Sequence, residues 1–325
     1  MRVLVTGGAG FFGGYAIAAL ESAGHECHAY DIAPPSYEMV AVAPGLAARL
    51  VLGEIGDHQR LLATCRDLKI DAIVHAAGLV GYERSLEDPR AFYETNVMGF
   101  VNVCEAAREL DLKKVVLISS NAVYHKGSGD NLAETDLPFS TSRSIPAAHY
   151  GTSKMACEAI GLVYAEFHGL DFLALRVTAI YGFGMRNPVH IKPMVENAVL
   201  GKPTRFETGG PMKRDYTHVL DCASAVVAAV EKPPQQIGAE RIINVAAGKV
   251  TTCAELAEIV REVVPGADIF VGDTLTPMEA ENLKMRAPMD ITLARRELGW
   301  APRWSIEEGI RQYAEQFRDY ANPRY

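Results

Sequence analysis

The sequence predicts an α/β protein with a doubly wound, parallel, Rossmann-like sheet and a smaller C-terminal lobe. Three observations carry this prediction: a glycine-rich turn after the first apolar run, an alternation of strand-length apolar runs with helical periodicity, and a change of composition after Tyr181. Beyond that residue, glycine and proline break the chain into short pieces. We expect residues 1–180 to form the sheet domain, to which 218–246 return, and residues 181–325 to form mainly the lobe.

The first element is a short apolar run, Val3 to Val5, which is typical of a buried parallel strand. A helix begins near Phe11, and glycines fill the turn before it and the helix start. Without Cβ atoms there, backbone N–H groups can approach a pyrophosphate, and the positive end of the helix faces that charge. The spacing therefore indicates a dinucleotide site. The residues expected to contact the cofactor here are Gly7, Gly10, Phe11, Phe12 and Gly13.

The second strand supports this interpretation and selects the cofactor. Residues 25–30 form another strand-length run, and Asp31 stands at its end. A carboxylate at this place can hydrogen-bond the adenosine ribose hydroxyls and repels a 2′-phosphate. We therefore predict NAD, rather than NADP, as the cofactor.

The alternation of strands and helices continues through the first half of the chain. Strand-length runs cover 49–52, 72–75, 115–119 and 172–177, with helical periodicity over 61–68 and 92–110. Because the carboxyl ends of parallel strands share one edge, the residues that end or follow them should converge on one crevice. These residues are Gly7, Asp31, Ala76, Ala77, Gly78, Ser119 and Ser120. The lobe beyond Tyr181 would supply the substrate side of this crevice.

Composition and charge argue against several classes of protein. The 325 residues carry a net charge of -8, which argues against nucleic acid or an anionic membrane as the main partner. The longest apolar run, 222–230, falls well short of the roughly 20 residues that span a bilayer. The six cysteines are widely spread and the histidines show no ligand spacing. We expect no metal site, and a cytoplasmic protein with reduced thiols.

Tyr150 and Lys154 lie four residues apart in a stretch of helical periodicity, 149–168, and so share a helix face. Taken alone, this spacing is common, and a solvated pair is the simpler interpretation. After a dinucleotide turn and a Ser119-Ser120 strand end, a catalytic pair is favoured. The ammonium and an oxidised nicotinamide would both stabilise the phenolate, so that Tyr150 becomes a base near neutral pH. Lys154 would also hold the nicotinamide ribose.

Apolar residues cover more than one face of the 149–168 helix. The helix that ends at Leu110 has the same character. Such helices are buried on both sides, inside a domain or against a second subunit. We expect the two to form the interface of a homodimer.

The order and spacing of these motifs resemble the extended short-chain dehydrogenases/reductases of the NAD-dependent epimerase/dehydratase family, and among them the nucleotide-sugar 4-epimerases. The likeness covers nearly the whole chain and is highly specific as a set. The matching segments are 6–13, Asp31, 54–55, 75–78, 96–99, 119–124, 150–154, 214–219 and 298–300.

The resemblance implies a role for each matching residue. Tyr150 would be the general base and acid, Lys154 its partner, and Ser120 the hydroxyl that holds the substrate oxygen. Glu54 and Ile55 would flank the adenine. The cofactor contacts expected beyond those of the glycine-rich turn are Asp31, Glu54, Ile55, Ala76, Ala77, Gly78, Asn96, Ser119, Tyr150 and Lys154. The substrate contacts expected are Val80, Arg84, Ser120, Asn121, Thr178, Arg186, Arg214 and Arg286.

Departures from the family bear on the reaction. Asn121 and Ala122 follow Ser120 where family dehydratases and decarboxylases carry an acid, so simple hydride transfer is favoured. The loop 77–85 resembles the sugar pocket of the 4-epimerases, yet Ala179 stands where those enzymes have a diphosphate-binding asparagine.

Three hypotheses stay open at this point. The first is a nucleotide-sugar epimerase that keeps its NAD. The second is an NAD-dependent dehydrogenase of a free sugar, sugar acid or polyol, which releases NADH. The third is a non-catalytic NAD-binding protein, which the intact Ser120, Tyr150 and Lys154 disfavour.

Overall fold

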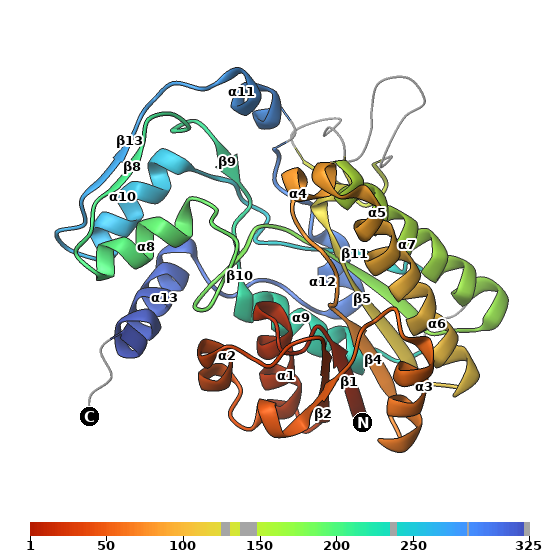
Figure 1. The fold of residues 1–325 in the computed structure, drawn as a ribbon. Helices are drawn as coiled ribbons and strands as arrows, with labels where there is room; N and C mark the ends of the chain where they lie inside the picture. The colour runs from red at the N-terminus through yellow and green to blue at the C-terminus, as the bar shows by residue number, and fades with distance from the viewer. Residues whose placement is uncertain (125–130, 137–147, 235–238, 285, 322–325) are drawn as a thin grey trace.

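The computed structural model describes residues 1–124, 131–136, 148–234, 239–284 and 286–321, and it has a helix-covered sheet with a smaller lobe beside it (Figure 1). In the described part of the chain, the central sheet has seven parallel strands in the order β11-β6-β5-β4-β1-β2-β3. Their bounds are Arg2–Thr6 (β1), Glu26–Asp31 (β2), Leu50–Leu52 (β3), Ala72–His75 (β4), Lys114–Ser120 (β5), Phe172–Val177 (β6) and Ile242–Val245 (β11). The predicted doubly wound, Rossmann-like fold is confirmed.

Alternate residues of the central strands pack into two helical layers. In β1, Val3 and Val5 join the core formed with α1 (Phe11–Ser22) and α9 (Val219–Glu231), whereas Leu4 joins the opposite core. The helices of that opposite layer are α3 (His58–Asp67), α6 (Gly99–Glu109) and α7 (Ala148–His168). Strands covered on both faces need apolar residues at successive positions, which explains the continuous apolar runs of the sequence.

The strand order reverses next to β1. From there, β2 and β3 continue toward one edge of the sheet, and β4, β5, β6 and β11 continue toward the other. The carboxyl ends of β1 and β4 lie side by side, with Thr6 opposite His75 in the register. In sheets of this kind, such a reversal opens the crevice that binds ligands.

The lobe is assembled from short strands and helices around its own apolar core. Its strands pair as β7 with β10, β8 with β13, and β9 with β12. The bounds are Ile180–Tyr181 (β7), Thr204–Phe206 (β8), Lys213–Arg214 (β9), Thr217–His218 (β10), Thr251–Thr252 (β12), Ile269–Val271 (β13), Ile191–Val199 (α8), Cys253–Val263 (α10), Pro277–Leu283 (α11) and Ile306–Ala321 (α13). Helix α12 (Thr292–Leu298) returns to the sheet domain, where Leu293 and Ala294 join the core formed with α1 and α9.

Short elements connect the main strands and helices. They are α2 (Tyr37–Val42), η1 (Leu46–Arg49), α4 (Tyr82–Glu87), α5 (Pro89–Phe92), the π-helix η2 (Tyr93–Met98) and η3 (Asn121–Val123). The single helix expected over 92–110 is therefore divided into a π-helical turn and α6. A π-helical turn has one more residue per hydrogen-bonded ring than an α-helix, and the apolar periodicity does not reveal it.

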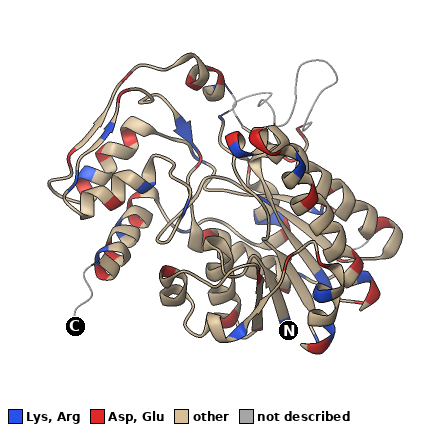
Figure 2. Cartoon of the chain, in the orientation of Figure 1, with Lys and Arg blue, Asp and Glu red and all other residues tan. Residues whose placement is uncertain are grey.

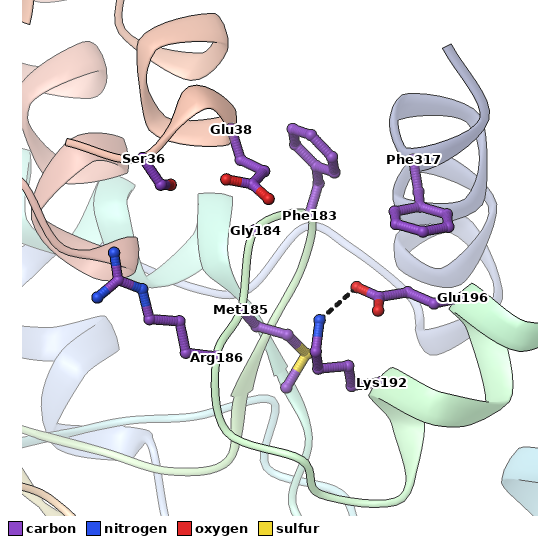
Figure 3. A pocket seen from close by; sticks show the side chains of 9 residues that line it. All are labelled: Ser36, Glu38, Phe183, Gly184, Met185, Arg186, Lys192, Glu196 and Phe317. Carbon is purple, nitrogen blue, oxygen red and sulfur yellow. Dashed lines mark hydrogen bonds and ion pairs between the residues drawn. The ribbon is translucent and has the colours of Figure 1, made fainter. Parts of the chain in front are cut away.

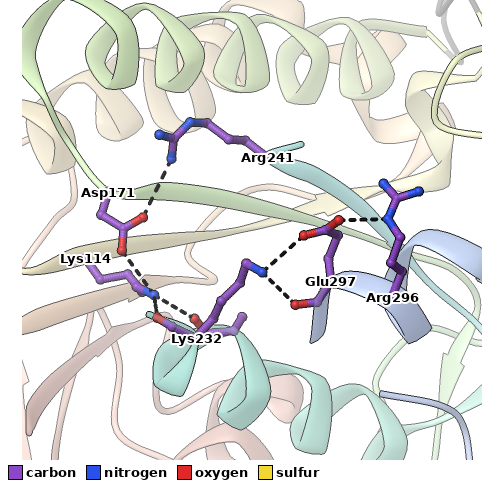
Figure 4. Close-up of polar contacts among 7 residues, drawn as sticks. Lys114, Asp171, Lys232, Arg241, Arg296 and Glu297 are labelled. Carbon is purple, nitrogen blue, oxygen red and sulfur yellow. Dashed lines mark hydrogen bonds and ion pairs between the residues drawn. The ribbon is translucent and has the colours of Figure 1, made fainter. Parts of the chain in front are cut away.

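A buried ionic cluster lies at the amino ends of β5, β6 and β11 (Figure 4). The Nζ atom of Lys114 lies 3.1 Å from Oδ2 of Asp171, and it also donates hydrogen bonds to the carbonyl oxygens of Ala229 and Lys232 at the end of α9. Arg241 approaches the other oxygen of Asp171 at 3.6 Å. The cluster ties β5, β6, β11 and α9 together at the edge opposite the crevice.

The outer helices carry both acidic and basic residues (Figure 2). Within the described ranges, no helix is long and apolar enough to cross a membrane, and no group of three or more His, Cys, Asp or Glu side chains has the arrangement of a metal site. The six cysteines are free and buried.

Candidate active site

The glycine-rich turn brings backbone N–H groups to the start of α1. Gly7 has φ of +70°, and a Cβ there would lie 2.7 Å from the backbone nitrogen of Ala77. A Cβ on Gly13 would lie 2.1 Å from the carbonyl oxygen of Gly7, so α1 rests directly on the turn. Gly10 is the N-cap residue of α1, and it has no side chain that could bond the first N–H groups of the helix. The first helical N–H groups, including those of Phe11 and Phe12, therefore suit a pyrophosphate.

Asp31 ends β2 beside this turn. Its Oδ2 accepts the N–H of Ala9 at 3.0 Å and its Oδ1 accepts the N–H of Ile32 at 2.8 Å. A carboxylate has about four acceptor sites, so two ribose hydroxyls still find acceptors. The residues present thus fit the adenosine ribose of NAD.

The next residues predicted to contact the cofactor follow β4 and β3. Ala76 and Ala77 follow β4, and their N–H groups bond Thr6 at 3.1 and 3.3 Å. Ile55 is buried against Gly99, where a Cβ would lie 2.7 Å from Ile55 Cγ2. Glu54 precedes it, with its carbonyl oxygen bonded by the hydroxyl of Tyr30 at 3.1 Å.

Asn96 joins the end of β4 to α7. Its Oδ1 accepts the N–H of Leu79 at 2.7 Å, and its Nδ2 donates to the carbonyl of Leu79 at 3.0 Å and to Ser153 Oγ at 2.9 Å. A Cβ on Gly78 would lie 2.9 Å from Asn96 Oδ1. Asn96 therefore fixes the 78–79 turn against the helix that carries Tyr150.

Ser120, Tyr150 and Lys154 meet at the carboxyl end of β5. Burial raises the pKa of the Tyr150 phenol, while the Ser120 hydroxyl opposes the rise. Lys154 Nζ donates to the carbonyl of Ile118 at 2.9 Å. Burial lowers the pKa of Lys154. The phenol alone is thus a poor base at neutral pH, and it needs the positive charges of Lys154 and an oxidised nicotinamide to ionise.

A second group of predicted residues lines a small cavity next to Ser120. The lining residues are Asn121, Thr178, Ala179, Arg214, Asp215, Arg286 and Ala287. The Nε atoms of Arg214 and Arg286 are buried and have no hydrogen-bond partner among the described residues. Burial, with the charge of Arg214, lowers the pKa of Arg286 to about 10. Two guanidinium groups that share a cavity, each with a buried Nε atom lacking a hydrogen-bond partner among the described residues, suit an anion.

Asp215 joins the backbone segments around Arg214 and Arg286 by hydrogen bonds. The sequence analysis did not identify this role. Its carboxylate accepts the N–H groups of Ala247 at 3.1 Å, Gly248 at 3.2 Å and Met289 at 3.0 Å. Burial raises the pKa of Asp215 to about 7, although the backbone bonds oppose this. The sequence held one signal for this role, the adjacent residues Arg214 and Asp215. A carboxylate in a buried segment seldom lacks hydrogen-bond partners.

The structure does not bring every predicted substrate residue to this cavity. Arg186 lines a separate cavity of about 380 Å³ between α2, α8 and α13, together with Ser36 and Glu38 (Figure 3). Val80 lies just before α4 and Arg84 lies within it, and both are exposed. Ser119 points away from the crevice, because its hydroxyl donates to Glu158 at 2.5 Å.

Together, the sheet, the glycine-rich turn and the Ser120, Tyr150 and Lys154 group define an NAD-dependent enzyme of the short-chain dehydrogenase/reductase type. Residues 3–246 match the model of the "NAD dependent epimerase/dehydratase family". The chain belongs to this family. The predicted family, enzyme class and cofactor are confirmed.

Relatives and solved structures cover nearly the whole chain. The UDP-glucose 4-epimerase of Rhizobium meliloti (strain 1021) is 29% identical over 328 residues, which is 94% of this chain and 93% of that protein. The UDP-glucuronate 4-epimerase of Thermodesulfobacterium geofontis is 27% identical over 320 residues, 95% of this chain and 94% of that protein. The crystal structure of the Thermus thermophilus UDP-glucose 4-epimerase with NAD matches with a TM-score of 0.81 and 28% identity, and it covers 98% of this chain and 99% of that one.

Proposed function

We propose that the protein is an NAD-dependent epimerase that inverts a secondary alcohol carbon of a nucleotide sugar, with UDP-sugars as the substrate class. The observation that carries the proposal is that Arg214 and Arg286, whose Nε atoms are buried and without a partner among the described residues, share a cavity with Asn121 beside Ser120. This pair suits a diphosphate, and a neutral free sugar would leave both guanidinium groups unpaired. The 4-epimerase relatives support the same substrate class.

The chain's own residues then have defined tasks. NAD, which the 7–13 turn and Asp31 would hold, would supply hydride transfer to and from the substrate carbon. Ser120 Oγ holds the reacting oxygen, and the phenolate of Tyr150 takes the hydroxyl proton and, as the phenol, later gives it back. Lys154 stabilises the phenolate. Arg214 and Arg286 keep the diphosphate in place between the two transfers, so the sugar can present its other face without leaving.

The test combines bound nucleotide with turnover. Freshly purified protein should release NAD or NADH on denaturation, and UDP-glucose or UDP-glucuronate should give its 4-epimer without net NADH. Arg286→Met should raise KM by about 10- to 100-fold, as expected for one lost charge-assisted bond. Arg205→Met is the matched control, because Arg205 also lies in the lobe but pairs with Asp268 at the surface. Failure of every nucleotide sugar to react would contradict the proposal.

A second candidate is an NAD-dependent dehydrogenase of a free sugar, sugar acid or polyol. Ala179 favours it: this residue lines the anion cavity with φ of +34°, a conformation that asparagine tolerates better than alanine. The asparagine expected at this place from the 4-epimerases is therefore missing where the backbone would suit it. Growth of NADH absorbance with free sugars or sugar acids, and none with nucleotide sugars, would select this candidate.

We also propose a homodimer that pairs through α6 and α7. The outer face of α7 exposes Leu162, Val163 and Phe167, whose exposed fractions are 38%, 50% and 77%. Apolar groups gathered on one helix face commonly mark a protein interface. Light scattering should give the mass of a dimer for the native chain and of a monomer for Val163→Glu/Phe167→Glu; a native monomer would refute the proposal.

Two further expectations stay proposals. Residues 1–180 with 218–246 would form the NAD-binding unit, and residues 181–325 mainly the substrate unit. A cytoplasmic location is supported by the six free, buried cysteines, which suit a reducing compartment.

A further inference from the structure

A buried ion pair lies directly behind the catalytic residues. Arg176 on β6 donates two hydrogen bonds to Glu158 on α7, from Nε to Oε1 at 2.9 Å and from Nη2 to Oε2 at 2.8 Å. The side chains are only 4% and 3% exposed. Replacing such a pair by apolar residues is often neutral for stability, so its presence in the core calls for another explanation.

The Glu158–Arg176 pair is hydrogen-bonded to residues on both sides of Ser120. Ser119, the preceding residue, donates its hydroxyl hydrogen bond to Glu158 at 2.5 Å. Tyr124, which follows η3, accepts a bond from Nη1 of Arg176 at 2.8 Å. Tyr124 in turn donates to Asn244 on β11 at 2.8 Å. The position of Ser120 above the sheet is therefore set from α7 and β6.

Glu158 also follows Lys154 by one turn on the same face of α7. Two other titratable groups of the described residues that interact electrostatically with Lys154, His75 and Cys157, are neutral near pH 7. Burial lowers the pKa of His75 on β4 to about 3, and Lys154 adds to this. Burial raises the pKa of the Cys157 thiol on α7 to about 11. Among the described residues that act on Lys154, Glu158 is thus the charged acid that favours its ammonium form.

We infer that Glu158, held by Arg176, is a positioning residue for catalysis: it fixes the strand end that carries Ser120 and supplies the negative charge that keeps the Lys154 ammonium in place. This inference rests on the catalytic roles proposed for Ser120, Tyr150 and Lys154. Glu158 touches neither substrate nor cofactor in this scheme. It acts through Ser119 and Lys154.

The main test replaces the pair by Glu158→Gln/Arg176→Gln in the NAD-bound protein. Ionisation of Tyr150 is followed by ultraviolet absorbance of the phenolate, as the difference from Tyr150→Phe. We expect the titration to move to higher pH, because a less charged Lys154 stabilises the phenolate less. Turnover at neutral pH should fall by about 10- to 100-fold and recover in part at higher pH. Glu158→Asp, which keeps the charge, should restore much of the native titration.

The control removes another buried ion pair, Lys114→Met/Asp171→Asn, which lies at the amino ends of β5 and β6, away from the catalytic residues. It should leave the Tyr150 titration unchanged. A pair variant that retains NAD and titrates like the native protein would overturn the inference. The titration needs no substrate, so it decides the inference even where no nucleotide sugar reacts.

A milder variant covers the case in which the double variant fails to fold. Ser119→Ala removes only the bond from β5 to Glu158. We expect turnover to fall by about threefold to tenfold with an unchanged pH profile, because the charge beside Lys154 stays. Native turnover in this variant would refute the positioning of Ser120 by Glu158.

Discussion

Substitution of Gly13 by alanine tests the dinucleotide turn at a single atom. The added Cβ would lie 2.1 Å from the carbonyl oxygen of Gly7 and 2.7 Å from Gly8 Cα, and both neighbours are backbone atoms that no side-chain rotation can move. To relieve this contact, the start of α1 must shift by about 1 Å away from the turn. The free-energy cost of such overpacking is about 1–3 kcal/mol. If the strain falls on the NAD-bound conformation, the affinity for NAD decreases by about 5- to 150-fold.

Two glycines provide a graded comparison. A Cβ on Gly10 would lie 3.1 Å from the carbonyl oxygen of Gly7, whereas Gly56 has open space within 4 Å and an ordinary backbone. Titration calorimetry with NAD should therefore rank the alanine variants as Gly56 near native, Gly10 intermediate and Gly13 weakest. Unfolding temperatures measured without NAD would show whether the strain already acts in the free protein. Native affinity of Gly13→Ala, or equal losses at Gly13 and Gly56, would refute the reasoning.

Three further predictions concern the base, the cofactor and pH. Tyr150→Phe should lower turnover by roughly 10²- to 10⁴-fold and leave NAD binding largely intact in calorimetry; equal activity would overturn the assignment. Asp31→Ala should relax the preference against NADP in binding assays, and an unchanged preference would mean that another residue discriminates. Burial lowers the pKa of His218 to about 4, so the folded state binds fewer protons than the unfolded state between that value and about 6.5. Stability should therefore fall as the pH drops through this window, by at most about 3 kcal/mol. His218→Phe should flatten this slope in urea unfolding, and an unchanged slope would exclude His218 as its source.

Local patterns predicted the parts of the site that depend on neighbours in sequence. Gly7 and Asp31 follow adjacent strands of a parallel sheet, and such strand ends share an edge whatever the rest of the chain does. Tyr150 and Lys154 lie one turn apart on a helix, and their spacing alone aligns them. To predict these placements, it was enough to know the periodicity of the helices and strands and their order along the chain.

Partners across the fold were beyond this reasoning. Arg214 and Arg286 share a cavity while Arg186 lines another one, and the packing of the lobe decides which of them meet. Glu158 and Arg176 were not recognised as a pair, because helical spacing shows where Glu158 points but not which side chain of β6 receives it. A charged residue inside the apolar strand 172–177 was the signal that such a partner exists.

The burial of every cysteine has a practical consequence. Burial raises the pKa of the Cys27, Cys65 and Cys253 thiols to about 12, so the reactive thiolate is scarce in the native state. Cys65 lies on the buried face of α3, which covers the sheet, while Cys253 begins α10 in the lobe. A disulfide reagent would then label only molecules that have opened, and the order in which these cysteines are modified would report which half of the protein opens first.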